Sequence, residues 1–266
     1  MTDSTLSGKA KSGRRGWLIK LAVAAFWLSL WQAAYWAVGQ DLLVASPVQV
    51  AGRLVRWAGN WDFWRTALYS LGRILAGFGA GVAAGCMLAA LCSRLPLARA
   101  LFSPLLGVVK ATPVSSFIIL ALVWIQGARV PMFISFLMVL PIVWANVSEG
   151  IAQLDPRLSQ MARLFGLSRG QRLIKVYLPQ IMPYLVSAMT VSMGLGWKAG
   201  IAAEVLGTPE LAIGRELYYA KIYLETADLF AWTAVVVALS MLLERGMVRL
   251  IARLGRRFHW VRVTCA

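Results

Sequence analysis

The sequence predicts an all-α, polytopic membrane protein with about six transmembrane helices, and three observations support this. Hydrophobic residues make up 59% of the 266 residues, far above the share of a soluble domain. Apolar runs of roughly the ~20 residues needed to cross a bilayer recur along the chain. The basic residues stand in short polar segments between these runs, as they do in the loops of membrane proteins.

The composition also excludes several kinds of function. The net charge is +16, but the basic residues do not belong to a soluble domain with its own core, so nucleic-acid binding is not expected. The three cysteines, Cys86, Cys92 and Cys265, have no metal-binding or redox spacing, and His259 is the only histidine. A G-x-x-x-x-G-K-[ST] phosphate loop is missing from the sequence. We therefore expect no catalytic residue, no metal site and no bound cofactor in this chain.

The first part of the chain reads as a tail, a membrane span and an interfacial segment. Residues 1–16 form a basic N-terminal tail. Trp17–Val38 is long for a signal-peptide core and has aromatic residues near both ends, so it reads as a retained transmembrane helix. Residues 40–65 mix tryptophan with arginine, which predicts an amphipathic segment at the membrane interface. We treat 17–60 as one leading unit.

Five further apolar segments complete the predicted bundle. They are expected at about 66–92, 101–126, 131–148, 181–206 and 227–247. In the second span, Gly77, Gly81 and Gly85 form a small-residue ridge, which favours close packing within the chain over a dimer seam. The third span contains Pro104 and Thr112-Pro113, which predict a kink or a broken helix.

The distribution of charge predicts the orientation. With six spans and the N-terminus inside, the inner segments 1–20, 93–100, 150–180 and 245–266 hold 18 Lys and Arg residues, and the outer segments hold six. This bias predicts that both termini, and the long polar loop in 150–180, lie in the cytoplasm.

Residues 155–179, which we call the docking loop, form the longest polar interruption in the apolar sequence. Asp155 is a good N-cap and Pro156 suits the first helical position, so a short helix begins there. The spacing of Leu158, Met161, Ala162 and Phe165 places them on one apolar face.

The same loop carries signals for a turn and a second helix. Gly166 is placed to end the first helix in a left-handed conformation. Ser168 and Gln171 have the spacing of a capping box, so a second short helix is expected there. Pro179 marks the end of that helix or the start of the next element. A partner subunit, the lipid surface or the protein's own bundle could cover the apolar face.

A family resemblance follows from the spacing within this loop. Gln160-Met161-Ala162, Gly166 and Val176-x-Leu178-Pro179 resemble the EAA-x3-G-x9-I-x-LP motif of ABC importer permeases, with Gln160 and Met161 replacing the first two motif residues. Thr112-Pro113 and the segments 141–150 and 203–207 resemble the nitrate/sulfonate/taurine-type subgroup of that family. The resemblance covers residues from about 60 to 250, so 61–248 is expected to be the permease core and 249–266 a basic cytoplasmic tail.

The resemblance implies a fold, partners and a location. It implies the type I ABC importer permease fold, a permease homodimer, two ABC ATPase subunits that bind ATP and Mg, and an extracytoplasmic solute-binding protein. It also implies the bacterial inner membrane. The loop would form a coupling helix that docks on the ATPase, through Arg157, Leu158, Gln160, Met161, Ala162, Phe165, Gly166, Leu178 and Pro179. On residue grounds, small Ala162 and Gly166 would let a partner surface approach closely.

The subgroup implies a small anionic solute, such as a sulfonate, nitrate or taurine. A thiamine precursor or another small organic solute is the alternative within the family. Outside the family, an ion-coupled secondary transporter is the alternative, although such proteins usually have more spans in two repeated halves.

Ionisable residues at membrane depth are candidates for the translocation path. The candidates are Lys110, Thr112, Trp197, Lys198 and Glu204. Lys198 and Glu204 are six residues apart and do not share a helix face, so an ion pair between them on one straight helix is not expected. A water-filled cavity, or a carboxylate from another helix, would lower the cost of burying Lys198. Arg73 is expected to have a structural role near the interface.

Overall fold

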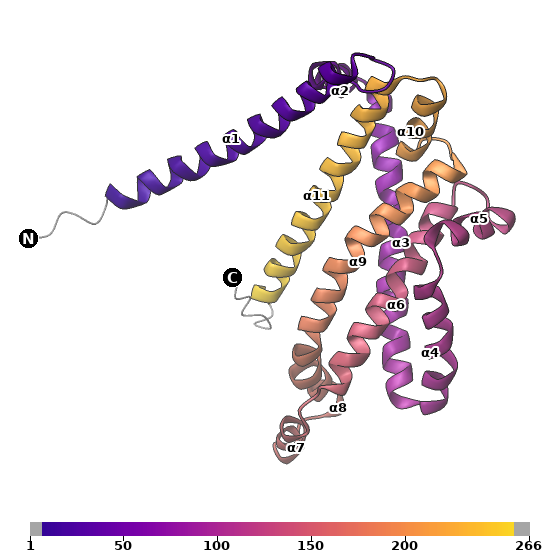
Figure 1. The fold of residues 1–266 in the computed structure, drawn as a ribbon. Coiled ribbons are helices and arrows are strands. Elements are labelled where there is room, and N and C mark those ends of the chain that lie inside the picture. The colour runs from indigo at the N-terminus through magenta and orange to yellow at the C-terminus, as the bar shows by residue number, and fades with distance from the viewer. Residues whose placement is uncertain (1–6, 258–266) are drawn as a thin grey trace, which may run out of the picture.

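The computed structural model describes residues 7–257, and its regular elements are all helical (Figure 1). The elements are α1 Ser7–Val38, α2 Pro47–Ala58, α3 Trp61–Arg94, α4 Pro96–Ala111, α5 Val114–Trp124, α6 Val130–Ala152, α7 Pro156–Leu164, α8 Arg169–Arg172, a π-helical turn Leu173–Tyr177, α9 Leu178–Gly207, α10 Ile213–Ile222 and α11 Thr226–Arg257. The expected all-α fold is confirmed. His259, Cys265 and the end of the predicted basic tail lie outside the described residues.

The predicted spans correspond to α1, α3, the pair α4 and α5, α6, α9 and α11. Within the described residues, four helices (α1, α3, α6 and α11) are long and apolar enough to cross a membrane, and the bent pair α4–α5 could form a fifth span. With 30 residues α9 is long enough, but it carries Lys198 and Glu204 and does not reach the same hydropathy. Several helices extend beyond their predicted limits: α3 begins at Trp61, and α11 continues to Arg257.

The third predicted span is two helices. The axes of α4 and α5 differ by 106° across a short break. Thr112 ends α4 with extended backbone, and Pro113 has no N–H to continue the hydrogen-bond ladder. The predicted break is therefore confirmed at Thr112-Pro113. Pro104 lies inside α4 and does not interrupt it.

The centre of the bundle is the packing of α3 against α6 and of α6 against α9 (Figure 1). Gly77, Gly81 and Gly85 of α3 face α6. A Cβ atom at Gly81 would lie 2.8 Å from Cβ of Val139, and one at Gly85 would lie 2.8 Å from Cβ of Val143. Only glycine allows this approach, so the ridge packs within the chain, as the sequence favoured.

The third helix of this centre, α9, packs in the same way. A Cβ atom at Gly200 would lie 2.6 Å from Cγ1 of Ile74 on α3, and one at Gly196 would lie 3.1 Å from Oγ of Ser135 on α6. The Ser135 hydroxyl donates a buried hydrogen bond of 3.0 Å to the Ile74 carbonyl oxygen. The three helices therefore meet at one point through small residues and an interhelical hydrogen bond.

The N-terminal helices behave differently from each other. The sequence predicted an interfacial segment at 40–65, but only Pro47–Ala58 forms a separate helix, and its Trp57 packs into the bundle against Trp232. An ion pair of 3.0 Å between Arg53 and Asp228 ties α2 to α11. In Figure 1, α1 leaves the bundle at α2, and its described side chains are largely exposed.

We predict that Gly81→Ala destabilises the bundle, whereas Gly79→Ala does not. Both changes raise helix propensity equally, but only the Cβ at position 81 meets another helix, since nothing lies within 4 Å of a Cβ at Gly79. Overpacking of this kind costs about 1–3 kcal/mol. Unfolding of the purified protein in mixed micelles by SDS measures the difference. Equal stability of the two variants would show that the α3–α6 contact does not require glycine.

Candidate functional site

The docking loop projects from the lower end of the bundle in Figure 1, between α6 and α9. Its first helix, α7, begins as predicted: Pro156 is in the first turn, and the Asp155 carboxylate accepts a 2.8 Å hydrogen bond from the Arg157 N–H. The Asp155 N–H donates a 3.0 Å hydrogen bond to the side-chain oxygen of Gln180 on α9. The start of α7 is therefore held to the base of the bundle.

The end of α7 is also fixed. Gly166 has φ of +69°, the left-handed conformation predicted for it. Its N–H donates to the Arg163 carbonyl, and the Leu167 N–H donates to the Ala162 carbonyl. These two bonds form a Schellman motif, which satisfies carbonyl groups at the end of the helix. A side chain at position 166 would strain this turn, because nonglycine residues adopt such a φ at a cost.

The loop then joins α9 without a break in helical structure. The capping box of Ser168 and Gln171 is present, as predicted, and α8 continues through the π-helical turn Leu173–Tyr177 into α9. Pro179 lies in the first turn of α9. The Ser159 and Tyr177 hydroxyls share a 2.8 Å hydrogen bond, which ties α7 to the π turn.

The apolar face of α7 is mostly uncovered, with one exception. Met161 is 48% exposed, Phe165 is 77% exposed and Leu158 is also exposed, whereas Ala162 is 1% exposed. Ala162 is therefore covered within this chain, which corrects the expectation that it lets a partner approach. Leu164, which the helical spacing does not place on this face, is 88% exposed. The free apolar surface comprises Leu158, Met161, Leu164 and Phe165.

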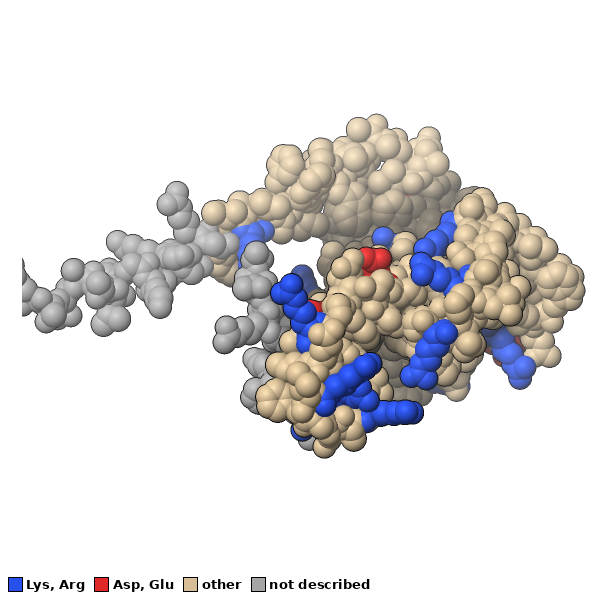
Figure 2. Space-filling view, turned by 90° about the horizontal axis from the view of Figure 1, so that it is seen from below, with Lys and Arg blue, Asp and Glu red and all other residues tan. Residues whose placement is uncertain are grey.

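Positive charge surrounds this apolar surface. Figure 2 looks at the molecule from below and shows Lys and Arg side chains spread over this face, with few acidic groups. Arg157, Arg163 and Arg169 of the loop are exposed, and so is Gln160. Such an arrangement, an apolar centre with a polar rim, is typical of a protein–protein interface.

A hollow of about 490 Å³ lies on the flank of the bundle. Its lining comes from the end of α4, the start of α5, the middle of α6 and the middle of α9: Val109, Lys110, Thr112, Val114, Met138, Pro141, Ile142, Leu195, Lys198, Ala199 and Ala202. The structure thus brings together three of the predicted path residues, Lys110, Thr112 and Lys198. The break after α4 places the first two beside α9.

The two lysines are the charged groups of this hollow. Both are exposed, and neither has a carboxylate within 4 Å among the described residues. The Thr112 hydroxyl donates to the Val108 carbonyl in its own helix, which leaves its lone pairs to accept. The remaining lining is apolar. The hollow can therefore attract an anion while offering an apolar wall to the rest of a small solute.

Trp197 and Glu204 lie elsewhere, in the interior of the bundle. Trp197 is 1% exposed, and its indole N–H donates a 3.2 Å hydrogen bond to the Val236 carbonyl of α11. Glu204 is 0% exposed. Neither residue lines the hollow. The two are seven residues apart and so share a face of α9, and that face points inward.

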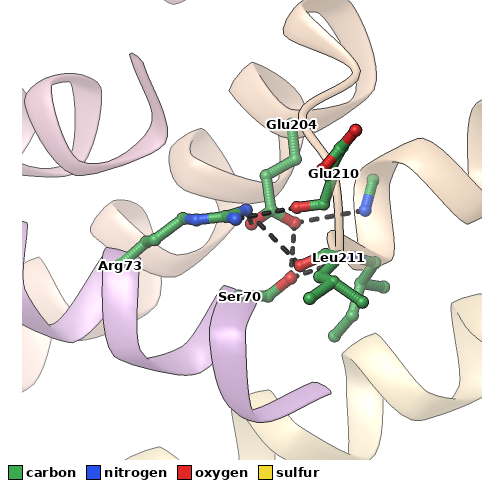
Figure 3. Close-up of polar contacts among 7 residues, drawn as sticks. Ser70, Arg73, Glu204, Glu210 and Leu211 are labelled. Carbon is green, nitrogen blue, oxygen red and sulfur yellow. Dashed lines mark hydrogen bonds and ion pairs between the residues drawn. The ribbon is translucent and has the colours of Figure 1, made fainter. Parts of the chain in front are cut away.

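Glu204 is the centre of a buried polar cluster, shown in Figure 3. The Ser70 hydroxyl of α3 donates a 2.8 Å hydrogen bond to Oε2 of Glu204, and accepts one of 2.8 Å from the Ile213 N–H. The Gly214 N–H donates to the same Oε2 at 3.2 Å. Both N–H groups belong to the first turn of α10, so the carboxylate lies at the positive end of that helix.

Arg73 supplies the positive charge of the cluster. Its Nη1 lies 3.8 Å from Oε1 of Glu204, and its Nη2 donates a 2.7 Å hydrogen bond to the Glu210 carbonyl (Figure 3). A Cβ at Gly214 would lie 2.4 Å from Cβ of Glu204, so only glycine fits there. The structural role expected of Arg73 is found, with a partner that the sequence did not reveal.

We predict that Ser70→Ala destabilises the protein and that Ser93→Ala, in the same helix, does not. Loss of the Ser70 hydroxyl leaves a buried carboxylate and a buried N–H each one hydrogen bond short, which costs about 1–3 kcal/mol. Ser93 is exposed and bonds only to its own helix. The stability of both variants is measured by thermal unfolding in detergent, with the folded fraction followed by size-exclusion chromatography. Equal midpoints of thermal unfolding for the two variants would show that the Ser70 bridge between Glu204 and the Ile213 N–H does not stabilise the protein.

A family model described as "Binding-protein-dependent transport system inner membrane component" matches residues 81–258. That range contains the whole docking loop and every residue that lines the hollow.

Individual relatives match much of the chain, but at low sequence identity. The taurine transport system permease protein TauC of Escherichia coli (strain K12) is 25% identical over 230 residues, which cover 84% of this chain and 83% of TauC. The bicarbonate transport system permease protein CmpB of Synechococcus elongatus is 27% identical over 184 residues, covering 69% of this chain and 66% of CmpB. A chain from the crystal structure of an amino acid ABC transporter with histidines is 17% identical and has a TM-score of 0.55, covering 71% of this chain and 91% of that one. This last likeness concerns the fold alone.

Proposed function

The chain belongs to the family of binding-protein-dependent transport system inner membrane components, which makes it an ABC permease subunit, and we propose how its described surfaces serve import. In this family ATP hydrolysis resides in a separate ATPase subunit. The docking loop is the contact with that ATPase, and the hollow is part of the path of the solute. Residues 61–248 form the permease core.

The observation that carries the docking proposal is the exposed apolar surface of a rigidly held helix. An exposed apolar patch rimmed by polar residues marks an interaction site. Both ends of α7 are capped, so its side chains are presented in a fixed arrangement. Preorganisation of this kind lowers the cost of binding. We propose that Leu158, Met161 and Phe165, together with Leu164, enter a groove of the ATPase.

The orientation and assembly follow from this contact. The docking loop then lies in the cytoplasm, with α10 and the α4–α5 break toward the extracytoplasmic side. The excess of Lys and Arg in the segments at the loop's end supports this orientation. The proposed assembly is two copies of this chain with two ATPase subunits, which bind the ATP and Mg, and an extracytoplasmic solute-binding protein that delivers the solute.

We propose that the solute is a small anion, of the sulfonate, nitrate or taurine type. The support is the pair of ammonium groups, Lys110 and Lys198, which share one hollow and have no carboxylate within 4 Å among residues 7–257. An unpaired ammonium costs about 2.5–3.5 kcal/mol at the centre of a membrane helix, so both need water or an anion. The hollow lies on the flank of one chain, where a second permease copy would enclose it. A thiamine precursor remains the second candidate, favoured only by the largely apolar lining.

The docking proposal predicts that Met161→Asp and Phe165→Asp abolish assembly with the ATPase. Each change places a carboxylate in the centre of the apolar contact, and an unpaired buried charge is strongly unfavourable. Copurification of the ATPase from membranes, and native mass of the purified complex, measure assembly. Gly166→Val should weaken assembly too, through the strained turn.

Gly170→Val is the matched control, because Gly170 is in the same loop but has an ordinary φ and no neighbour within 4 Å of its Cβ. Insertion of every variant is checked by its abundance in membranes. A 2:2 complex of wild-type abundance in both aspartate variants would show that α7 is not the contact.

The path proposal predicts that Lys198→Met and Lys198→Glu reduce uptake of a taurine-type anion while assembly stays intact. Loss of the ammonium removes attraction for the anion, and a glutamate repels it, so the glutamate variant should be the more impaired. Uptake and ATPase activity are measured together in proteoliposomes with the binding protein present.

Lys20→Met serves as the control, since Lys20 is an exposed lysine on α1, outside the hollow. Normal uptake by both Lys198 variants in assembled complexes would remove this residue from the path. Failure of both variants to assemble would assign it a structural role.

A further inference from the structure

A second pocket, of about 240 Å³, lies at the docking-loop end of the bundle, beside the turn between α3 and α4. It is lined by Cys92, Ser93, Arg99, Trp144, Ser148, Ile151 and Ala152. Three helices contribute to it, and none of its residues belongs to the hollow or to the docking loop. Its volume far exceeds the ~30 Å³ share of one water molecule.

The pocket is rich in hydrogen-bond donors. The indole Nε1 of Trp144 and the hydroxyl of Ser148 are buried atoms, and neither has a hydrogen-bond partner among the described residues. The two residues are four apart on α6 and so share a face. An indole N–H can only donate, and a buried donor without a partner is costly. A hydrogen-bond acceptor bound in the pocket would therefore satisfy both groups.

Positive charge adds to these donors. The guanidinium of Arg99 has no carboxylate within 4 Å among the described residues. The 16-residue helix α4 begins beside the pocket without a side-chain cap, so its first N–H groups contribute further positive potential. Glu149, the carboxylate nearest in sequence, is exposed and accepts a hydrogen bond from Gln153. The chemistry fits an oxyanion.

The surroundings of the pocket are those of a lipid interface. Leu95 at the α3–α4 turn is 52% exposed, and Leu97 and Leu101, on the side of α4 away from Arg99, are 82% and 66% exposed, so exposed apolar surface lies close to the pocket. They stand at the end of α3, which is long and apolar enough to cross a membrane, so they are expected near the level where acyl chains meet headgroups. Trp144 is also typical of this depth, where the ring is apolar and the N–H is polar. An anion that carries acyl chains would satisfy both parts of the surface.

We propose that this pocket binds the phosphate of an anionic phospholipid from the adjoining leaflet, with Arg99, Trp144 and Ser148 donating to its oxygen atoms. Basic pockets between transmembrane helices are known to recognise lipid headgroups through such contacts. The site is separate from the proposed docking and path surfaces, so its test does not depend on them.

The test uses the full-length protein, purified and delipidated in detergent, and titrated with phosphatidylglycerol. Native mass spectrometry counts the bound lipids. Arg99→Gln and Trp144→Phe should each weaken the tightest lipid about tenfold, the effect of losing one charge-assisted or buried hydrogen bond. Phenylalanine keeps the ring of Trp144 and removes only the donor. Arg94→Gln is the control, because Arg94 is an exposed arginine of the same turn that does not line the pocket.

A second arm distinguishes the source of the phosphate. Titration with inorganic phosphate, at millimolar concentration, should leave phosphatidylglycerol bound if the acyl chains contribute. Displacement of the lipid by inorganic phosphate would overturn the lipid assignment in favour of a free oxyanion. Equal lipid binding by the Arg99, Trp144 and Arg94 variants would overturn the site altogether.

Discussion

The structure depends on the close approach of α3, α6 and α9 at glycine. Lipid is as apolar as leucine, so helices in a membrane gain little from hydrophobic burial and must gain from contact and interhelical hydrogen bonds. Gly81 and Gly200 provide the contact, and the Ser135 hydroxyl provides the hydrogen bond. Both proposed functional surfaces rest on this packing, because the docking loop joins the lower ends of α6 and α9 and the hollow lies along their flank.

The charged residues within the apolar helices fall into two groups, one paired and buried and one facing a hollow. Glu204 is enclosed with Arg73, Ser70 and the first N–H groups of α10, so its charge holds three elements together. Lys110 and Lys198 face a hollow and have no such partner among the described residues. The contrast separates a structural charge from charges that are available to a solute. Sequence position alone does not reveal the difference, because all four charged residues lie in apolar helices.

The sequence predicted local features well and long-range ones poorly. The cap of Asp155, the left-handed Gly166 and the break at Thr112-Pro113 follow from rules that act within a few residues, and all three are present. The pairing of Arg73 with Glu204 joins residues 131 positions apart, and no local rule selects that partner. Likewise, the 3.6-residue period placed Ala162 on the apolar face of α7, but could not say that the folded chain would bury it.

The unbroken helical path from Arg169 through the π turn to Gly207 has a mechanical consequence. Its 39 residues form a rod of about 60 Å. The contact with Ile74 at Gly200 lies seven residues from the far end, roughly 10 Å from it and about 45 Å from the loop. Contacts with α6 at both Tyr184 and Gly196 also hold α9 along this length, so a displacement at the loop would be carried toward the far end of α9 together with α6. A movement of the proposed ATPase partner would thus reach Glu204 and the start of α10 through one continuous helix.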